Sequence, residues 1–348
     1  MQINKKKEKN MSDQGVQTRV VEEKDDGMRL DRWFLQHFPN LKFGHLQKLL
    51  RGGQIRVDGG RVKSGSRLET GQTVRIPPLD ALAANPVKKN VKTTDYKLDE
   101  EDRALLASFV LYEDDDVLAV NKPAGLASQG GSRQKRHLDG ILAADAREKG
   151  IDRPHLVHRL DLETSGVCLV AKNAAVARKL GDAFRGHKLQ KYYWAVCLGV
   201  PEETEGEIVA PIAKKSIRGG DAMEVDPEFG KSSRTVYAVA DRLGNSAAWV
   251  VFSPLTGRTH QIRVHAAYMG CPLIGDTKYA SLEEEERFQD VMQEEDPPLH
   301  LHARRLIVPK SVLGKRALDI TAPLPDHMRR TCKKFGFTED ATMEEALL

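Results

Sequence analysis

Apolar positions recur along the chain with two different spacings, and these spacings predict its elements. Within residues 28–78, two short runs of helical spacing precede two runs that are typical of strands, IRV and TVRIP. The Asp-Gly pair of DGGR, directly after IRV, is typical of a hairpin turn. We therefore expect two short helices and a small sheet in this segment. The helical positions are Leu30, Trp33, Phe34 and Phe38 in the first run and Leu46, Leu49 and Leu50 in the second.

The chain after residue 104 mixes helix and strand patterns without strict alternation. FVLYEDDDVLAVNKPAGL predicts two strands around an acidic turn, and KRHLDGILAADAREKG predicts a helix. NAAVARKLGDAF predicts a further helix, with Val176, Leu180 and Phe184 in register and Asn173 as its N-cap. YYWAVCLGV, AAWVVFSP and HQIRVHA are predicted as strands. This order favours an α+β fold with a mixed, largely antiparallel sheet flanked by helices.

Two segments lack any such periodicity. Residues 1–27 carry charged runs without an apolar core, and we expect a disordered tail there rather than a signal peptide. Residues 79–104 mix charges in the same irregular way, and we expect a linker. The sequence therefore predicts a small module at 28–78 and a larger domain at 105–340.

Composition narrows the class of protein. The chain has 348 residues, of which 40% are hydrophobic and 30% charged, as is usual for a soluble globular protein. It contains no apolar run of about 18 residues, the length that a membrane-spanning helix needs. Its four cysteines have no CxxC spacing, so we expect neither a disulfide framework nor a zinc site, and a reducing cytoplasm as the location.

The net charge of +4 is unevenly distributed. Ten basic and three acidic residues lie between Met28 and Pro78, which suits a polyanionic partner, although a solvated basic surface would have the same composition. The stretch LQKLLRGGQIRVDGGRVKSGSRLETGQTVRIPP resembles the S4 RNA-binding module. The resemblance implies that Lys48, Arg51 and Arg56 contact RNA phosphates, which position RNA without reading its sequence.

Three further motifs contain side chains that can do chemistry. From the residues alone, the carboxylate among them is either a reactive group or a buried partner of an arginine that holds a turn. The histidine pairs match no zinc signature, and GKSS at 230–233 lacks the glycine spacing of a phosphate-binding loop. The side chains are His158, Arg159 and Asp161 in HRLDLETSG, Lys191 and Tyr193 in QKYYWAV, and Arg258, His260 and Arg263 in TGRTHQIRVH.

These motifs, together with LHLHARRL, resemble the RluA-type family of pseudouridine synthases over roughly residues 108–330. With the N-terminal module, and with APIAKK and GKSSRT between the motifs, the chain is most similar to the RluC branch, which modifies large-subunit (23S) ribosomal RNA. The resemblance implies isomerisation of specific uridines by base flipping, followed by cleavage and re-formation of the glycosidic bond. Because this reaction involves no net redox change or hydrolysis, we expect no metal and no cofactor.

The resemblance also implies roles for single residues. Asp161 would be the nucleophile or base, held charged by Arg263, and Tyr193 would pack against the extruded base. Arg159 would enter the RNA in place of the flipped uridine, since extrusion leaves a gap and costs a few kcal/mol. We expect Thr164–Gly166 to form the tight turn after Asp161. The supporting positions are His158, Thr164, Gly166, Arg258 and His260.

Other functions stay open at this point. A glycoside-type hydrolase would use Asp161 and Glu163 and would release free uracil. A transfer RNA pseudouridine synthase would share the catalytic motifs, and a non-catalytic ribosome-assembly protein would keep the fold as an RNA-binding platform. We expect large-subunit ribosomal RNA as the partner, no membrane association and a monomer. The sequence identifies neither the target uridines nor a role for the acidic segment 283–296.

Overall fold

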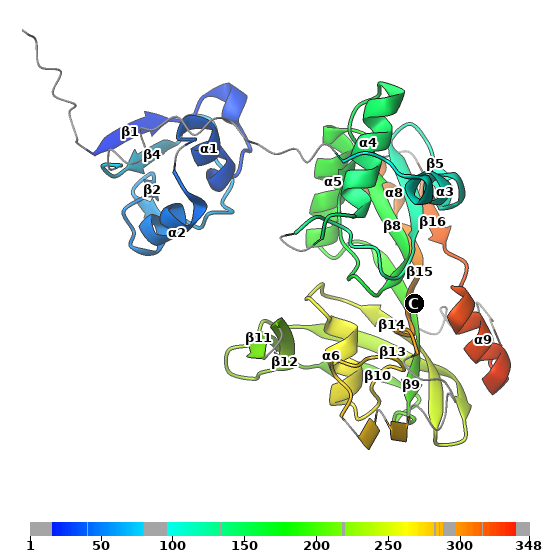
Figure 1. The fold of residues 1–348 in the computed structure, drawn as a ribbon. Coiled ribbons are helices and arrows are strands. Elements are labelled where there is room, and N and C mark those ends of the chain that lie inside the picture. The colour runs from blue at the N-terminus through cyan, green and yellow to red at the C-terminus, as the bar shows by residue number, and fades with distance from the viewer. Residues whose placement is uncertain are drawn as a thin grey trace, which may run out of the picture. The chain divides into compact units, whose positions relative to one another are not determined.

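The computed structural model describes residues 16–79 and 96–338, apart from residues 40, 132–133, 218–219, 282, 285, 288–296 and 315. The chain divides after Thr94 into two compact units, which are described separately (Figure 1). None of the helices in these described ranges is long and apolar enough to cross a membrane.

The first unit is a small module of two helices and a four-stranded sheet. The helices are α1 (Leu30–His37) and α2 (Phe43–Arg51), and the strands are β1 (Gln17–Val20), β2 (Arg56–Val57), β3 (Gly60–Arg61) and β4 (Thr73–Ile76). The sheet order is β1-β4-β2-β3. Asp58 and Gly59, with φ of 47° and 76°, turn the chain between β2 and β3, as the Asp-Gly pair predicted. The helices and strands predicted for this module are confirmed.

The prediction of a disordered tail over residues 1–27 is wrong for residues 16–27. Strand β1 pairs antiparallel with β4, and a short 3-10 helix, η1 (Glu23–Asp25), follows. The buried carboxylate of Asp25 accepts a hydrogen bond from Trp33 Nε1 at 3.1 Å and lies 2.8 Å from His37 Nε2. Every residue of β1 is exposed, so this strand has no apolar alternation that the sequence could reveal. Residues 1–15 lie outside the described residues.

The second unit is built on a ten-stranded sheet of order β10-β13-β14-β9-β15-β8-β6-β5, with β16 paired to β15 and β7 paired to β8. Its strands are β5 (Val110–Glu113), β6 (Val117–Lys122), β7 (His155–Leu156), β8 (Ser165–Ala171), β9 (Gln190–Leu198), β10 (Glu205–Val209), β13 (Arg234–Leu243), β14 (Ala247–Pro254), β15 (Leu301–Val308) and β16 (Leu318–Thr321). A separate hairpin consists of β11 (Ile212–Ile217) and β12 (Gly220–Val225). Among the described strands only β8 and β15 pair in parallel, so the predicted α+β fold with a largely antiparallel sheet is confirmed.

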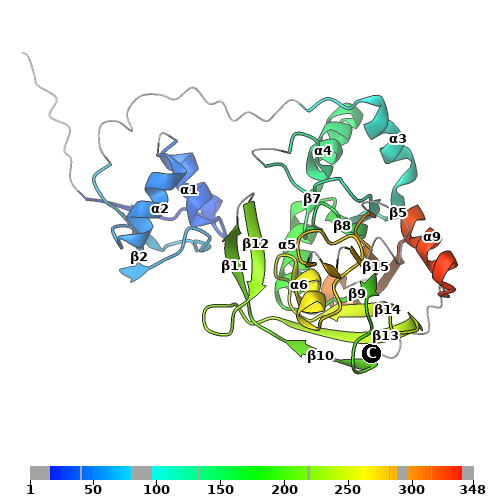
Figure 2. The ribbon, with the colours of Figure 1, turned by 60° about the horizontal axis from the view of Figure 1, so that its bottom comes forward.

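Helices cover both faces of this sheet (Figures 1 and 2). Near β8, α4 (Leu138–Lys149) packs on the Cys168 side and α5 (Ala174–Arg185) packs on the Leu169 side. Near β9 and β14, α6 (Gln261–Tyr268) and α9 (Asp326–Phe335) lie on opposite faces in the same way. The α5 N-cap is as predicted, because Asn173 Oδ1 accepts a hydrogen bond from the Val176 N–H at 2.9 Å. Two further described helices are α3 (Glu100–Ser108) and α8 (Lys310–Leu313).

Two predictions about elements of this unit are wrong. HQIRVHA was predicted as a strand but forms α6, whose residues Gln261–Ala266 are all buried. A helix buried on every side has no polar face to show helical spacing, and its Ile and Val residues favour a strand. The predicted linker, 79–104, ends earlier than expected, since α3 begins at Glu100 behind an Asp99 capping box, and Tyr96 packs against the core. Residues 80–95 lie outside the described residues.

Candidate active site

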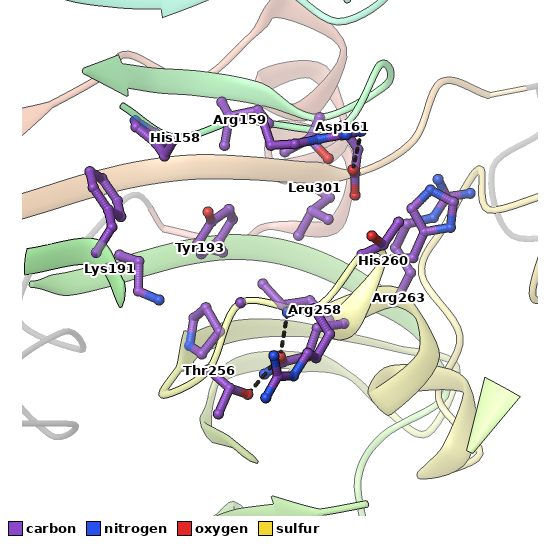
Figure 3. Close-up of a pocket in the computed structure, with 18 of the residues that line it drawn as sticks. His158, Arg159, Asp161, Lys191, Tyr193, Thr256, Arg258, His260, Arg263 and Leu301 are labelled. Carbon is purple, nitrogen blue, oxygen red and sulfur yellow. Dashed lines mark hydrogen bonds and ion pairs between the residues drawn. The ribbon is translucent and has the colours of Figure 1, made fainter. Parts of the chain in front are cut away.

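A cavity of about 470 Å³ opens between the β7–β8 loop, strand β9 and the segment that leads into α6 (Figure 3). The three motifs are far apart in sequence, yet the structure places all of their candidate side chains around this one cavity. A concave site with a few convergent polar groups is the usual form of an active site. The candidates that line it are His158, Arg159, Asp161, Thr164, Lys191, Tyr193, Arg258, His260 and Arg263.

The β7–β8 loop is held on both sides of Asp161 by bonds to its backbone. Lys122, fully buried, donates from Nζ to the carbonyl oxygens of Pro123 at 2.9 Å, Leu126 at 2.7 Å and Leu162 at 3.3 Å. Ser128 Oγ lies 2.6 Å from the Leu160 carbonyl oxygen, to which it donates, and accepts from the Leu160 N–H at 3.0 Å. Burial lowers the pKa of Lys122 to about 8. The loop is therefore fixed without using the side chains of Arg159 or Asp161.

Asp161 extends from this loop into the cavity with 20% of its side chain exposed. Its nearest cation is Arg159, whose Nη2 lies 3.8 Å from Oδ1 and whose side chain is 67% exposed. An ion pair at that separation and exposure contributes about 0–1 kcal/mol, so it holds neither group firmly. Both side chains thus remain available to a substrate.

The predicted pairing of Arg263 with Asp161 is wrong for this structure. Arg263 is 4% exposed and donates from Nε and Nη2 to the Asp276 carboxylate at 2.8 and 2.6 Å. Its Nη1 donates to Glu163 Oε2 at 3.0 Å, and its guanidinium lies over the Tyr279 ring at 5.2 Å from the centroid. Asp276 is fully buried and takes two parallel bonds, the strongest geometry that a guanidinium offers. Arg263 therefore connects α6 to the loop through Glu163 instead.

His158 supports the loop from its other end. Its Nε2 accepts a hydrogen bond from the Leu169 N–H at 2.8 Å, and its ring stacks on Phe184 with centroids 4.4 Å apart. Burial, and then the charge of Lys191, lower the pKa of His158 to about 3. The imidazole is therefore neutral near pH 7, as the accepting nitrogen requires.

The turn after Asp161 ends at Thr164, two residues earlier than predicted, because β8 begins at Ser165. It is closed by the Thr164 N–H, which donates to the Asp161 carbonyl oxygen at 3.2 Å. Gly166 instead lies within β8, with φ of 110°, and a Cβ there would lie 2.2 Å from the Ala303 carbonyl oxygen of β15. Glycine is thus required where β8 and β15 approach each other in parallel.

Strand β9 places Tyr193 on the cavity side of the sheet. Tyr192 and Trp194 pack in the core on the α9 side, so the alternation of the strand turns Tyr193 toward the α6 side. Burial, and then the charge of Asp161, raise the pKa of Tyr193 above its ordinary value. The hydroxyl is therefore protonated at neutral pH and able to donate a hydrogen bond.

The segment before α6 is held by side chains. Gln261 Oε1 accepts from Thr256 Oγ1 at 2.7 Å and from the Arg258 N–H at 3.0 Å. Arg258 donates from Nε to the Ser232 carbonyl oxygen at 3.0 Å. His260, with φ of 53°, places Nδ1 at 2.5 Å from the hydroxyl of Tyr279.

Sequence reasoning missed several residues that hold the site. One signal was present: Lys122 ends the apolar run VLAVNK, and a lysine buried in a strand needs partners. The others carry no such pattern: most bind partners that are 13 or more residues away, and Gln261, which binds the nearby Thr256 and Arg258, falls in the segment that was predicted as a strand. The missed residues are Lys122, Ser128, Gln261, Asp276 and Tyr279.

The predicted phosphate contacts lie in the first unit. Lys48 and Arg51 are exposed near the end of α2, and Arg51 Nε donates to the Gln47 carbonyl oxygen at 3.4 Å. Arg56 is half-buried and donates to the carbonyl oxygens of Gly53 and Gly59, both at 3.1 Å. Arg56 thus braces the turn around β2, whereas Lys48 and Arg51 present their charges to solvent.

Comparisons with known proteins agree with this geometry. The RNA pseudouridylate synthase family pattern matches residues 116–268. The chain is 34% identical over 303 residues to Ribosomal large subunit pseudouridine synthase C of Rickettsia bellii, covering 87% of this chain and 96% of the relative. It is 35% identical over 323 residues to the protein of that name from Vibrio cholerae, covering 92% and 96%. The solved structure of Human RNA Pseudouridylate Synthase Domain Containing 4 has a TM-score of 0.56 and 27% identity, covering 68% of this chain and 95% of that one. This chain therefore belongs to the RNA pseudouridylate synthase family and is an isomerase that converts uridine in RNA to pseudouridine.

Proposed function

We propose that this protein converts specific uridines of large-subunit (23S) ribosomal RNA to pseudouridine, as a monomer in the cytoplasm. The observation that supports this RNA class is the similarity to relatives named Ribosomal large subunit pseudouridine synthase C. The alignment that covers 92% of this chain includes most of the first unit as well as the cavity. The similarity thus extends beyond the catalytic residues that all uridine isomerases need.

In the proposed mechanism, Asp161 acts on the ribose of a uridine extruded into the cavity. Its carboxylate either bonds to C1′ or removes a proton from the sugar, while the electron pair of the C1′–N1 bond stays with the uracil. The base then rotates and C5 bonds to C1′, while the bond between C1′ and the carboxylate breaks or the proton returns to the sugar. C5 finally loses its proton and N1 gains one. Tyr193, beside Asp161 in the cavity, packs against the base through this rotation.

Arg159 is suited to fill the gap that the extruded base leaves in the RNA. It lies on the same loop as Asp161, and its side chain is 67% exposed. Extrusion costs a few kcal/mol, which a cation that also contacts phosphate can offset. Arg263 has a different part, because Asp276 and Glu163 already occupy its donors. It acts as a positioning residue that holds Glu163, and with it the loop, at a fixed distance from α6.

The first unit is proposed to bind RNA phosphates through the solvent-facing charges of Lys48 and Arg51. Arg56 is proposed to contact a phosphate as well, while it holds the turn around β2. A double variant, Lys48→Ala with Arg51→Ala, tests this in RNA-binding titrations over a range of salt. Each lost phosphate contact makes the slope of log K against log salt shallower by roughly 0.7–0.9. An unchanged slope would show that these side chains do not contact RNA.

The decisive experiment maps pseudouridine in total RNA from a strain that lacks this chain. We expect loss at a few positions of the large ribosomal RNA, restored by the wild-type gene and not by Asp161→Asn. Loss confined to a transfer RNA would overturn the proposed RNA class while leaving the isomerase in place. Free uracil and an abasic RNA from the purified protein would identify the hydrolase that uses Asp161 and Glu163.

A further inference from the structure

One cavity residue has no part in the mechanism above. Lys191 lies on β9 two residues before Tyr193, so the alternation of the strand turns both side chains toward the cavity (Figure 3). It is half-buried. Among the described residues, none forms a hydrogen bond or an ion pair with its ammonium group. Charges that are partly removed from water are usually paired with an opposite charge or hydrogen-bonded, and Lys191 has neither kind of partner among the described residues.

In the part of the chain that the structure describes, no carboxylate pairs with Lys191. Val157 and Phe184 line the same end of the cavity, and the Phe184 ring stacks on His158. His158 is neutral and its Nε2 is already bonded to the Leu169 N–H. Burial lowers the pKa of Lys191 to about 8, which leaves the amine mostly protonated near pH 7. In the free protein water solvates this ammonium, and a substrate that displaces the water must supply its partner instead.

The reaction creates a suitable partner for a short time. When the C1′–N1 bond breaks, its electron pair stays on the uracil, which becomes an anion with charge on O2 and O4. When C5 bonds to C1′, the pair returns to a covalent bond and the ring becomes neutral again. Preorganised donors in a site that excludes water are most effective where charge develops in this way.

We propose that Lys191 is a further catalytic residue, whose ammonium binds a carbonyl oxygen of the extruded uracil and stabilises the anion during cleavage and rotation. This inference rests on the proposed function of the cavity as the active site. The uracil base is a more suitable partner for Lys191 than an RNA phosphate, because Lys191 lies on the same strand as Tyr193, which is proposed to pack against that base. The exposed Arg159 is better placed for the RNA backbone, which stays outside the sheet.

The test compares two RNA oligonucleotides, one with uridine and one with 5-fluorouridine at the target position. Fluorine withdraws electrons, so the 5-fluorouracil anion needs less stabilisation by the enzyme. Single-turnover rates of C1′–N1 cleavage are measured by chromatography of nuclease digests, for wild type, Lys191→Met and Lys191→Arg. RNA affinity is measured in parallel, and thermal melting checks that each variant folds.

We expect Lys191→Met to lower the rate on uridine by about 100-fold, the usual cost of losing one such donor. The loss should be about tenfold smaller on 5-fluorouridine, because only interactions that strengthen in the transition state raise the rate. RNA affinity should stay within a few-fold, and Lys191→Arg should recover most of the rate. The matched control is the exposed Lys188 of the same segment, where Lys188→Met should change both rates equally.

Equal losses on the two substrates, or a loss of RNA affinity alone, would overturn the inference. So would a fully active Lys191→Met. An inactive Asp161→Asn together with an active Lys191→Met would reject only the role of Lys191. An active Asp161→Asn would reject the proposed function of the cavity itself. If Lys191→Met fails to fold, Lys191→Gln takes its place, because the amide is polar but uncharged and the same smaller loss is expected on 5-fluorouridine.

Discussion

The two sides of the cavity are built in opposite ways. On the loop side, residues 157–164, the backbone is held by Lys122, Ser128 and a neutral His158. On the helix side, residues 254–263, the side chains are bound to one another or to those of residues 276–279, as in the bidentate pair of Arg263 with Asp276. The loop side therefore leaves its own charges, Arg159 and Asp161, for the substrate. On the helix side, the charge of Arg263 is neutralised by Asp276 and stabilises the fold.

This difference shows that a charged residue in an active site is not necessarily a group that reacts. Asp161 and Asp276 are both carboxylates near the same cavity, but Asp276 is bound in a close buried ion pair, whereas Asp161 has a long and exposed one with Arg159. Their distances to the nearest arginine nitrogen are 3.8 Å and 2.6 Å, respectively. Substitution of Asp161 on the loop side should accordingly reduce activity, whereas substitution of Asp276 on the helix side should reduce stability.

The largest effect is expected for Asp161→Asn on the loop side. The amide keeps the size of the side chain and removes its charge, so turnover should fall by more than about 10³-fold, as it does when a nucleophile is lost. RNA affinity should stay within a few-fold of wild type, because phosphate contacts are unchanged. Single-turnover assays and binding titrations measure the two quantities. Residual activity above that limit would remove Asp161 from the chemistry.

On the helix side, Asp276→Asn should mainly reduce stability. Removing one partner of a buried ion pair costs about 3–5 kcal/mol, because the other charge stays buried. Glu163→Gln is the matched variant on the same arginine, and should cost about 1 kcal/mol or less because Glu163 is 51% exposed. Urea denaturation gives both free energies of unfolding. Equal losses would show that Arg263 does not depend on the buried pair.

Acid should weaken the loop side through His158. Its pKa is lowered from 6.5 to about 3 in the folded chain, so below pH 6.5 the unfolded chain binds a proton that the folded chain does not. The free energy of unfolding therefore falls as pH drops from 6.5 toward 3, by up to about 1.4 kcal/mol per pH unit. Above pH 6.5 the imidazole of His158 is neutral in both the folded and the unfolded chain, so it does not change the free energy of unfolding.

The variant that isolates this effect is His158→Gln, which can still accept from the Leu169 N–H but does not titrate. Between pH 7 and pH 5 it should lose less stability than wild type, by about 2 kcal/mol. His300 and His302 have similarly lowered pKa values near 3 and contribute equally to both proteins. The same pH dependence in variant and wild type would contradict the assignment.

A smaller effect than that of Asp276→Asn is expected for Tyr279→Phe on the helix side. The hydroxyl lies 2.5 Å from His260 Nδ1 and accepts from the Met223 N–H at 3.1 Å, so it joins α6 to the β11–β12 hairpin. Its loss should cost about 1–2 kcal/mol, because two hydrogen bonds disappear and each is typically worth about 0.5–1.5 kcal/mol. Faster hydrogen exchange at the Met223 amide would locate the change. Unaltered exchange there would mean that the hairpin is held by other contacts.

The sequence predicted much of this arrangement, and the failures have physical causes. HRLDLETSG, QKYYWAV and TGRTHQIRVH supplied the side chains around the cavity, because local motifs carry their own chemistry. Partners such as Asp276 or Ser128 were missed, since which carboxylate reaches an arginine depends on how distant segments pack. The strand predicted at HQIRVHA failed for a related reason, because a helix buried on all sides loses the polar face that reveals its period.

The position of β15 has a consequence for how this enzyme is made. The strand lies between β9 and β8, and its parallel contact with β8 joins Ser165 to His302, 137 residues later. Contacts between such distant residues form late, because a long loop must close first. A nascent chain that has not yet emerged past residue 308 holds Asp161 and Tyr193 on two halves of a sheet without the strand between them. The catalytic cavity is thus completed only after residue 308 has emerged, and a chain that ends before β15 should lack the strand that joins its two halves.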